Sequence, residues 1–159
     1  MRRPIRLPTF LLLPLVVLVV SHAGAQYAPT LAPLAAKEHI SEAEALWLVG
    51  SVSGSLAIGA SVDEAPELLE ELNVIHASRV SEEGPVTFGR FSLFLLLIEE
   101  TSPGFWFGLV PSAHTAFHYL QRVGVVAAGL TPSHVMSGGE AVDLTRRYLS
   151  FVASVDGEP

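Results

Sequence analysis

The sequence of 159 residues contains no cysteine and few basic residues. Without cysteine the fold has no disulfide, so its stability must come from an apolar core. Nine Lys and Arg stand against sixteen Asp and Glu, which gives a net charge of −7. This balance argues against a nucleic-acid partner, because phosphates are bound by clusters of Lys and Arg. It also argues against an anionic membrane surface as a binding partner.

The N-terminal segment has the three parts of a secretory signal peptide. Residues 1–6 are basic, Leu11–Val20 is a short apolar run, and Ala23-Gly24-Ala25 fits the pattern that signal peptidase cleaves. The alternative is a retained N-terminal anchor, but the apolar run is short for a bilayer span. We therefore predict export to the periplasm or the cell surface after cleavage following Ala25. The mature chain would then hold six basic and sixteen acidic residues, a net charge of −10, and no transmembrane segment.

The sequence of the mature chain predicts an all-α fold. Strand signals are scarce, and segments whose apolar residues recur at helical spacing follow residues that favour the start of a helix. Candidate N-caps are Ser41, Thr87, Ser112 and Ser137, whose hydroxyls suit the first turn of a helix. Phe88–Ile98 is apolar nearly all round, which indicates a central buried helix. We predict an extended lead-in over residues 26–39, a single helical domain over residues 40–153 and a disordered tail over residues 154–159.

Parts of the domain are internally repeated. "APELLEELNVI" at 65–75 and "AFHYLQRVGVV" at 116–126 superpose at an offset of 51, and the segments that start at Val86 and Met136 superpose at an offset of 50. The segment that starts at Ile40 gives a further copy of the second half. A period near 50 predicts stacked helix–loop–helix units, about two full units plus a half unit.

This pattern resembles the S-layer homology repeat, a helix–loop–helix unit of about this length that typically occurs in three copies. The stretch "SAHTAFHYLQRVGVVAAG" and the following "MSGGEAVDLTRRYL" are similar to the family's W-A, A-I-x-Y-L, G-I-V-x-G and I-T-R-A-E motifs. The resemblance covers roughly Ile40 to Leu149. It implies a stacked helical fold and a binding or structural role in a bacterial cell envelope, without a cofactor.

The chain departs from the family at the motifs that matter for function. The family's Trp-Ala becomes Ser112-Ala113 here. The Arg of I-T-R-A-E, which in family members helps hold acidic cell-wall polymer, falls at Glu42, Phe88 and Gly138. Loss of that guanidinium removes the bidentate donor that anion recognition needs. We therefore expect a non-enzymatic module that docks to an envelope protein or a glycan, rather than a classical cell-wall anchor.

Two surface features are candidate docking sites. Phe105, Trp106 and Phe107 lie between helix-breaking residues. This trio could bind sugar rings or a partner protein, enter a membrane interface, or pack into the joint between two units, which is the interpretation we favour. Arg146 and Arg147, the only basic pair of the mature chain, could support a helix end or dock a partner.

A histidine pair provides the competing hypothesis. His114 and His118 are four residues apart on one predicted helix, a spacing that lets two imidazoles face one metal ion. A third ligand could come from His134 or His76, although no H-E-x-x-H motif is present. The alternative function is thus a small metal-dependent or carboxylate-based hydrolase. The interpretation we favour for the pair is two partly exposed helix histidines.

The truncated first unit leaves a question about its neighbours. A helix that starts at Ile40 without the first half of its unit would leave an apolar face uncovered. Its cover could come from Leu31–Ala36 or from a partner, including a second copy of the chain in a homo-oligomer.

Overall fold

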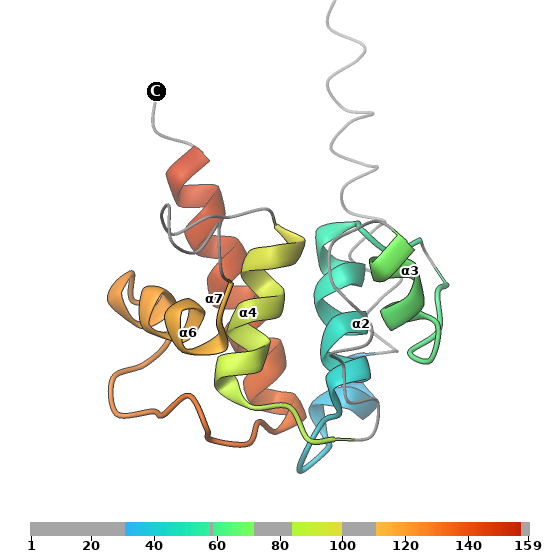
Figure 1. Cartoon of the computed structure of the whole chain (residues 1–159), viewed down its shortest axis with the longest axis horizontal. Helices are drawn as coiled ribbons and strands as arrows, with labels where there is room; N and C mark the ends of the chain where they lie inside the picture. Colours follow the sequence, from blue (N-terminus) through green and yellow to red (C-terminus); the bar gives the residue numbers. More distant parts are fainter. Residues whose placement is uncertain (1–30, 58, 72–83, 100–110, 157–159) are drawn as a thin grey trace, which may run out of the picture. The chain divides into compact units, whose positions relative to one another are not determined.

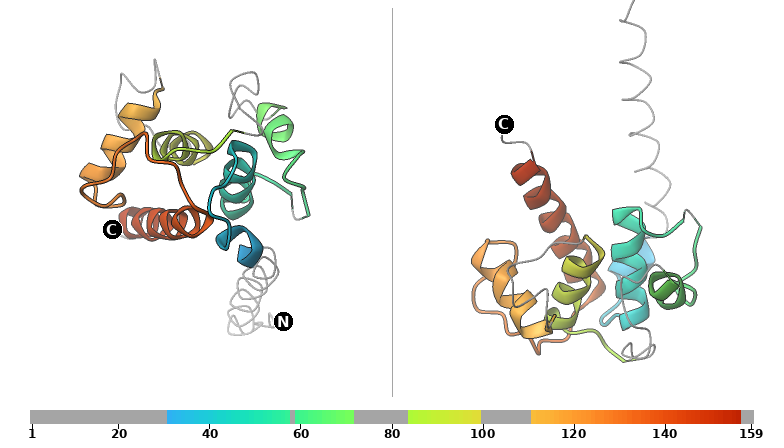
Figure 2. Two further views of the ribbon diagram at one scale, coloured as in Figure 1. Left: turned by 90° about the horizontal axis from the view of Figure 1, so that it is seen from below. Right: turned by 45° about the horizontal axis from the view of Figure 1, so that its top comes forward.

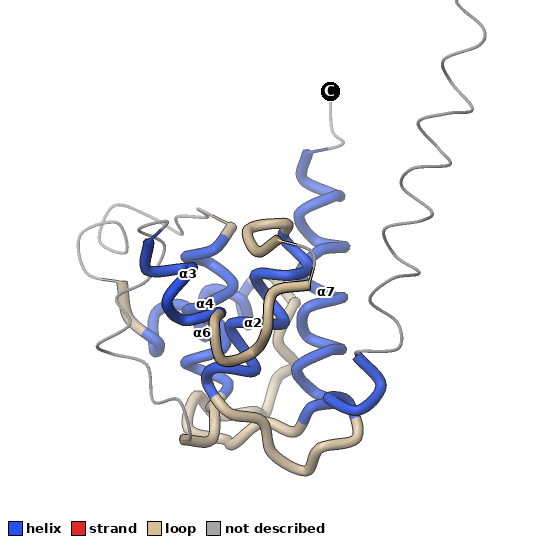
Figure 3. Tube along the Cα trace, turned by 90° about the vertical axis from the view of Figure 1, so that its right-hand side faces the viewer, coloured by secondary structure: helices blue, strands red, loops and turns tan. Residues whose placement is uncertain are grey.

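The computed structural model describes residues 31–57, 59–71, 84–99 and 111–156. Contacts divide the chain into residues 1–33 and residues 34–159, and the second unit contains the helices labelled in Figure 1. Its helices are α2 (Glu42–Ser53), α3 (Ala65–Glu71), α4 (Phe88–Ile98), α6 (Ala113–Arg122) and α7 (Gly138–Asp156). The described residues form no strand (Figure 3), which confirms the all-α class. Within the same residues, no helix has the length and apolar character needed to cross a membrane.

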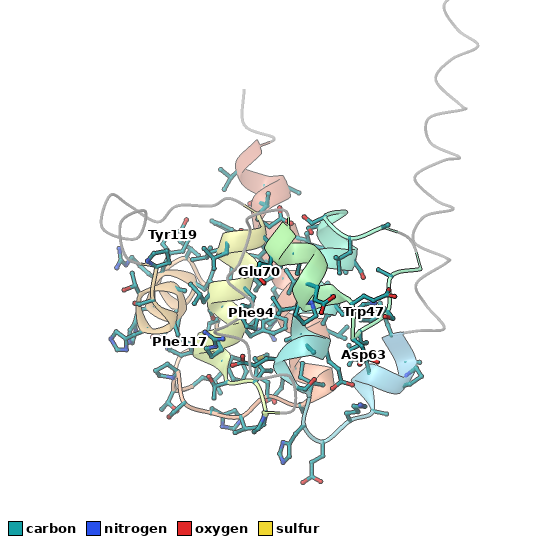
Figure 4. The ribbon with its side chains drawn as sticks, turned by 45° about the vertical axis from the view of Figure 1, so that its right-hand side comes forward. Trp47, Asp63, Glu70, Phe94, Phe117 and Tyr119 are labelled. Atoms are coloured by element: carbon teal, nitrogen blue, oxygen red, sulfur yellow. The ribbon has the colours of Figure 1, made fainter. Side chains whose placement is uncertain are left out.

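Helices α2, α4 and α7 contact one another and form the centre of the unit. Figure 2 (left) shows the three helices nearly end-on, with α6 against α4 on one side and α3 against α2 on the other. Helix α4 is buried along almost its whole length, as its uniformly apolar sequence predicts. Phe94 of α4 and Phe117 of α6, labelled in Figure 4, are both buried, and they contribute to the core that joins these two helices.

The helices begin where hydroxyl side chains cap their first turns. Ser41 accepts a hydrogen bond from the Glu44 N–H at 3.1 Å, and the Glu44 carboxylate accepts one from the Ser41 N–H at 3.0 Å. Thr87 and Ser112 cap α4 and α6 in the same position. At α7, Ser137 accepts from the Glu140 N–H at 3.3 Å while Glu140 accepts from the Ser137 N–H at 2.8 Å. The predicted caps are confirmed, and with them the starts of the four helices.

The residues directly before three of these caps are joined in a closed ring of backbone hydrogen bonds. The Ile40 N–H donates to the Met136 carbonyl at 3.3 Å, Met136 donates to Val86 at 3.0 Å, and Val86 donates to Ile40 at 2.9 Å. All three side chains are buried. We call this set of three residues the backbone ring. It fixes the N-termini of α2, α4 and α7 at a single point.

A second set of hydrogen bonds surrounds the backbone ring. The first residue of each central helix donates its N–H to a carbonyl of a neighbouring segment, in the pairs Glu42 to Gly84 at 3.1 Å, Phe88 to His134 at 2.9 Å and Gly138 to Lys37 at 3.0 Å. Because these N–H groups have no partner inside their own helices, the neighbouring segments satisfy them. The start of α2 is thereby bonded to the segment before α4, the start of α4 to the segment before α7, and the start of α7 to the segment before α2.

Two predicted boundaries are wrong. Residues 31–35 are helical rather than extended; Pro33 falls in the first turn, where a helix tolerates Pro because that N–H has no helical partner. Helix α7 continues to Asp156, beyond the predicted start of a disordered tail at residue 154. No Gly or Pro interrupts α7 between Glu140 and Asp156, so the chain itself gives no reason to stop earlier.

Candidate functional site

The first residues of the three central helices differ in their surroundings, and one of them borders the candidate site. These residues are Glu42, Phe88 and Gly138. Each directly follows a capping residue, but their side chains differ, and so do their surroundings.

Next to Glu42 the space is filled by an ion pair. Arg90 of α4 donates from Nε and Nη2 to the two carboxylate oxygens of Glu42, each at 2.8 Å. The guanidinium also lies over the ring of Phe94, 5.0 Å from its centroid, a cation–π contact. Arg90 therefore occupies the space beside Glu42 and links α4 to α2.

Next to Gly138 the space is filled by the lead-in. A Cβ at this position would lie 1.7 Å from the Leu34 carbonyl oxygen, so only glycine permits so close an approach. The Leu34 side chain is buried, and Lys37 forms an ion pair with Glu44. The sequence suggested either the lead-in or a partner as cover for the first helix. The lead-in contacts the starts of α7 and α2 through Leu34 and Lys37.

Next to Phe88 the structure leaves a cavity of about 190 Å³. Its lining residues come from the start of α4, the loop after α6 and one face of α7, and they are Phe88, Val125, Val126, Ala127, Leu130, Glu140, Asp143, Leu144 and Arg147. The volume is below the range of about 300–1,000 Å³ typical of drug-sized ligand sites. It suits a group as small as one side chain or one sugar ring.

The wall formed by the loop after α6 depends on a left-handed glycine. Gly124 has a φ of 81°, a conformation that suits glycine at a helix end, as its alignment in the repeat predicts. The reversal lets Val125 and Val126 donate their N–H groups back to the Leu120 carbonyl at 2.9 and 3.1 Å. Both valine side chains are buried, so this wall of the cavity is apolar and firmly held.

The opposite wall carries the charges. Burial alone would raise the pKa of Glu140, but hydrogen bonds from the Ser137 N–H and hydroxyl and the nearby His134 outweigh it, and the pKa lies below 4.5. The hydrogen bond from Arg146 is the main cause that lowers the pKa of Asp143, and Arg147 adds to it. Both carboxyl groups are thus ionised at neutral pH.

The two arginines of α7 have different surroundings. Arg146 binds one oxygen of Asp143 at 2.6 Å with a side chain that is 72% exposed, and Arg147 binds the other at 2.7 Å. Only Arg147 lines the cavity. It uses one of its guanidinium donors on Asp143, and a guanidinium has five, so N–H groups remain for a ligand.

Of the histidine candidates, His114 and His118 do not line the cavity, whereas the ring of His134 lies 5.5 Å from that of the lining residue Phe88, centroid to centroid. His114 and His118 are exposed on α6, and their ring centroids are 4.3 Å apart in an edge-to-face arrangement. His134 faces Glu140 instead, with Nε2 and Oε1 3.5 Å apart. No group of three His, Asp or Glu residues able to hold a metal ion occurs in the described part of the chain. Phe105, Trp106, Phe107 and His76 lie outside the described residues.

Sequence reasoning found Arg147 but missed the other walls of the cavity. The sequence predicts Phe88 as the first residue of a buried helix and Glu140 as the partner of Ser137 in a capping box, and neither pattern predicts a cavity. The available signal was that Phe88 and Glu140 each follow a cap closely, so both belong to helix starts that meet at the backbone ring.

Searches of protein-family models, curated proteins and solved structures gave no match.

Proposed function

We propose that this chain is an exported, non-enzymatic binding module of a bacterial cell envelope, built from units like the S-layer homology repeat. In this proposal it docks a protein or glycan partner at the cavity beside Phe88. The observation that carries the proposal is the contrast between the three helix starts. Glu42 is neutralised by Arg90 and Gly138 is covered by Leu34, whereas Phe88 borders open space.

The backbone ring supports the repeat part of the proposal. The repeat alignment makes Ile40, Val86 and Met136 equivalent, and these are the three residues whose N–H and carbonyl groups join in a closed cycle. Equivalent positions that meet at one point are what three related units around a common centre require. The signal-peptide features of residues 1–25 support export.

The chemistry of the cavity supports binding through mixed contacts. Phe88, Leu130 and Leu144 offer apolar surface, while Arg147 offers N–H donors at the rim. The carboxylates of Glu140 and Asp143 already accept hydrogen bonds from Ser137 and from the two arginines. An apolar group that carries a hydrogen-bond acceptor therefore suits the cavity better than a cation.

The histidine pair does not favour the hydrolase alternative. A catalytic zinc site takes three protein ligands and keeps one position open, and the described residues place no third ligand beside His114 and His118. The binding module is therefore the function we propose.

A matched set of variants tests the cavity as the docking site. Ala127 lines the cavity from an exposed position, so Ala127→Trp should fill it. Its exposed neighbour Ala128 does not line the cavity, so Ala128→Trp is the control. Arg147→Ala removes the donor at the rim, while Arg146→Ala removes a residue that shares Asp143 but lies outside the cavity. Binding to isolated envelope fractions should fall for Ala127→Trp and Arg147→Ala and persist for the two controls.

Treatment of the envelope fraction separates the two partner classes. Capture that is lost after protease treatment indicates a protein partner, and capture that survives protease but not muramidase treatment indicates a glycan. Equal binding by all four folded variants and the parent chain would contradict the proposal.

A further inference from the structure

We propose that His114 and His118 form a two-histidine site for a divalent transition-metal ion such as Zn²⁺, Ni²⁺ or Cu²⁺. This inference stands apart from the proposed function, because the pair lies on α6 and does not line the cavity. It rests on the position of the two rings, on the rigidity of the helix that carries them and on the lack of competing contacts.

The two rings project from the same exposed face of α6. Residues four apart on a helix are neighbours on its surface, and the ring centroids of His114 and His118 are 4.3 Å apart with an interplanar angle of 72°. Two imidazole nitrogens that share an ion at about 2.0–2.1 Å must approach each other to about 3 Å. Rings already in edge contact reach that geometry by small rotations of exposed side chains.

The opposite face of α6 holds the helix in place. Ala116, Phe117 and Leu120 are fully buried, and Ser112 caps the first turn through the Thr115 N–H at 3.2 Å. The ring of His118 also rests against Phe117, with centroids 5.3 Å apart. The spacing of the histidines is therefore fixed by a helix that is packed into the core, so little backbone ordering opposes ion binding.

The imidazole nitrogens of the pair are free to act as ligands. Within the described part of the chain, the contacts of His114 and His118 are ring contacts only, and no hydrogen bond or ion pair engages them. His134, by contrast, faces the Glu140 carboxylate at 3.5 Å. Binding an ion at the pair breaks no existing polar interaction, whereas binding at His134 competes with Glu140.

The ligand type sets the class of ion. Neutral imidazole suits zinc, copper and nickel, while Ca²⁺ and Mg²⁺ require oxygen ligands. Affinity should follow the usual order and be highest for Cu²⁺. Two protein ligands leave the other coordination positions of the ion to water or to a donor from another molecule, so the site is open.

Calorimetric titration of the tag-free, purified chain with ZnCl₂ and CuCl₂ at neutral pH tests the site. We expect saturable binding that His114→Ala and His118→Ala each weaken by at least about tenfold, since even outer-shell partners of metal ligands are worth that much. The matched control is His39→Ala, which removes an exposed histidine outside α6 and should leave the affinity unchanged. Acidification should release the ion, because protons compete for the ligand nitrogens.

A second variant keeps the histidine content and breaks only the spacing. The double change His118→Gln with Gln121→His moves one ring from four to seven residues away, about 10.5 Å along the helix, too far for both rings to bind one ion. We expect it to bind as weakly as His118→Ala while its circular dichroism stays that of the parent. Unchanged affinity in this variant, or no saturable binding by the parent chain, would overturn the proposal.

Discussion

Glu42 and Arg90 form a two-point ion pair between residues 48 positions apart, with both carboxylate oxygens 2.8 Å from guanidinium nitrogens. The side chains are only 9% and 27% exposed, so water screens this pair much less than an ordinary surface pair. The pair holds the start of α2 against α4. The charge of Arg90 is thereby used within the fold.

Replacing Arg90 with Ala should lower the free energy of unfolding by about 2–3 kcal/mol, because it leaves a buried carboxylate without this partner. Arg146→Ala is the control, since Arg146 belongs to an exposed pair that contributes at most about 1 kcal/mol. Urea denaturation of both variants measures the difference. Equal losses would show that the Glu42–Arg90 pair is no more important than a surface contact.

Two adjacent glycines should respond in opposite ways to alanine. Gly138→Ala places a Cβ 1.7 Å from the Leu34 carbonyl oxygen, and relieving such overlap with backbone costs about 1–3 kcal/mol. At Gly139 the nearest atom to an added Cβ, the Ala35 carbonyl oxygen, is 3.6 Å away, so Gly139→Ala should leave stability unchanged or raise it by up to about 1 kcal/mol. Thermal unfolding of the two variants side by side tests this. A stable Gly138→Ala would mean that the lead-in does not pack at this position.

The amide protons of the backbone ring should exchange slowly with solvent. Ile40, Val86 and Met136 lie outside the helices, yet their N–H groups are hydrogen-bonded among buried residues, so exchange requires global rather than local opening. The Ala60 N–H, bonded to the Ala57 carbonyl at 3.1 Å in a loop, is the comparison and should exchange much faster. Native-state hydrogen exchange measures both. Similar rates would indicate that the backbone ring opens locally.

Stability should fall in acid partly through Glu140. Its pKa in the folded chain lies below the ordinary value of 4.5, so the carboxylate stabilises the fold above pH 4.5 and this contribution is lost as the pH falls through the lower folded value. Glu140→Gln keeps a side-chain acceptor for the capping box and removes the charge. The variant should be less stable than the parent near about pH 7, and the difference should shrink in acid. A difference that does not depend on pH would assign the effect of Glu140 to shape rather than charge.

Local sequence signals were sufficient to predict the starts of α2, α4, α6 and α7. The caps at Ser41, Thr87 and Ser137 and the uniformly apolar Phe88–Ile98 each indicated a helix start or a buried helix through neighbours a few residues away. Such signals depend on hydrogen bonds within one turn and on burial, both of which the sequence encodes directly. The lead-in helix was missed because Pro33 reads as extended chain unless it is recognised as a first-turn residue.

The candidate site was harder to predict, because its parts are distant in sequence. Phe88 and Arg147 become neighbours only when α4 and α7 start from the same backbone ring. The spaces beside Glu42 and Gly138 are filled by Arg90 and Leu34. Both contacts join segments that are distant in sequence, so local patterns do not predict them. A repeat alignment predicts which positions are equivalent, but it does not give their different surroundings.

The backbone ring also limits how many chain segments can meet at this point. Open solenoids lengthen by adding a unit to an end, because each unit offers a free face to the next. Here Ile40, Val86 and Met136 each use their N–H on one neighbour and are bonded through their carbonyl by the other, so a fourth segment has no place to join. Each segment is needed to close the cycle, and residues from the beginning and the end of the domain must meet before it forms. The domain should consequently fold as one cooperative unit, and removing α7 should unfold α2 as well as α4.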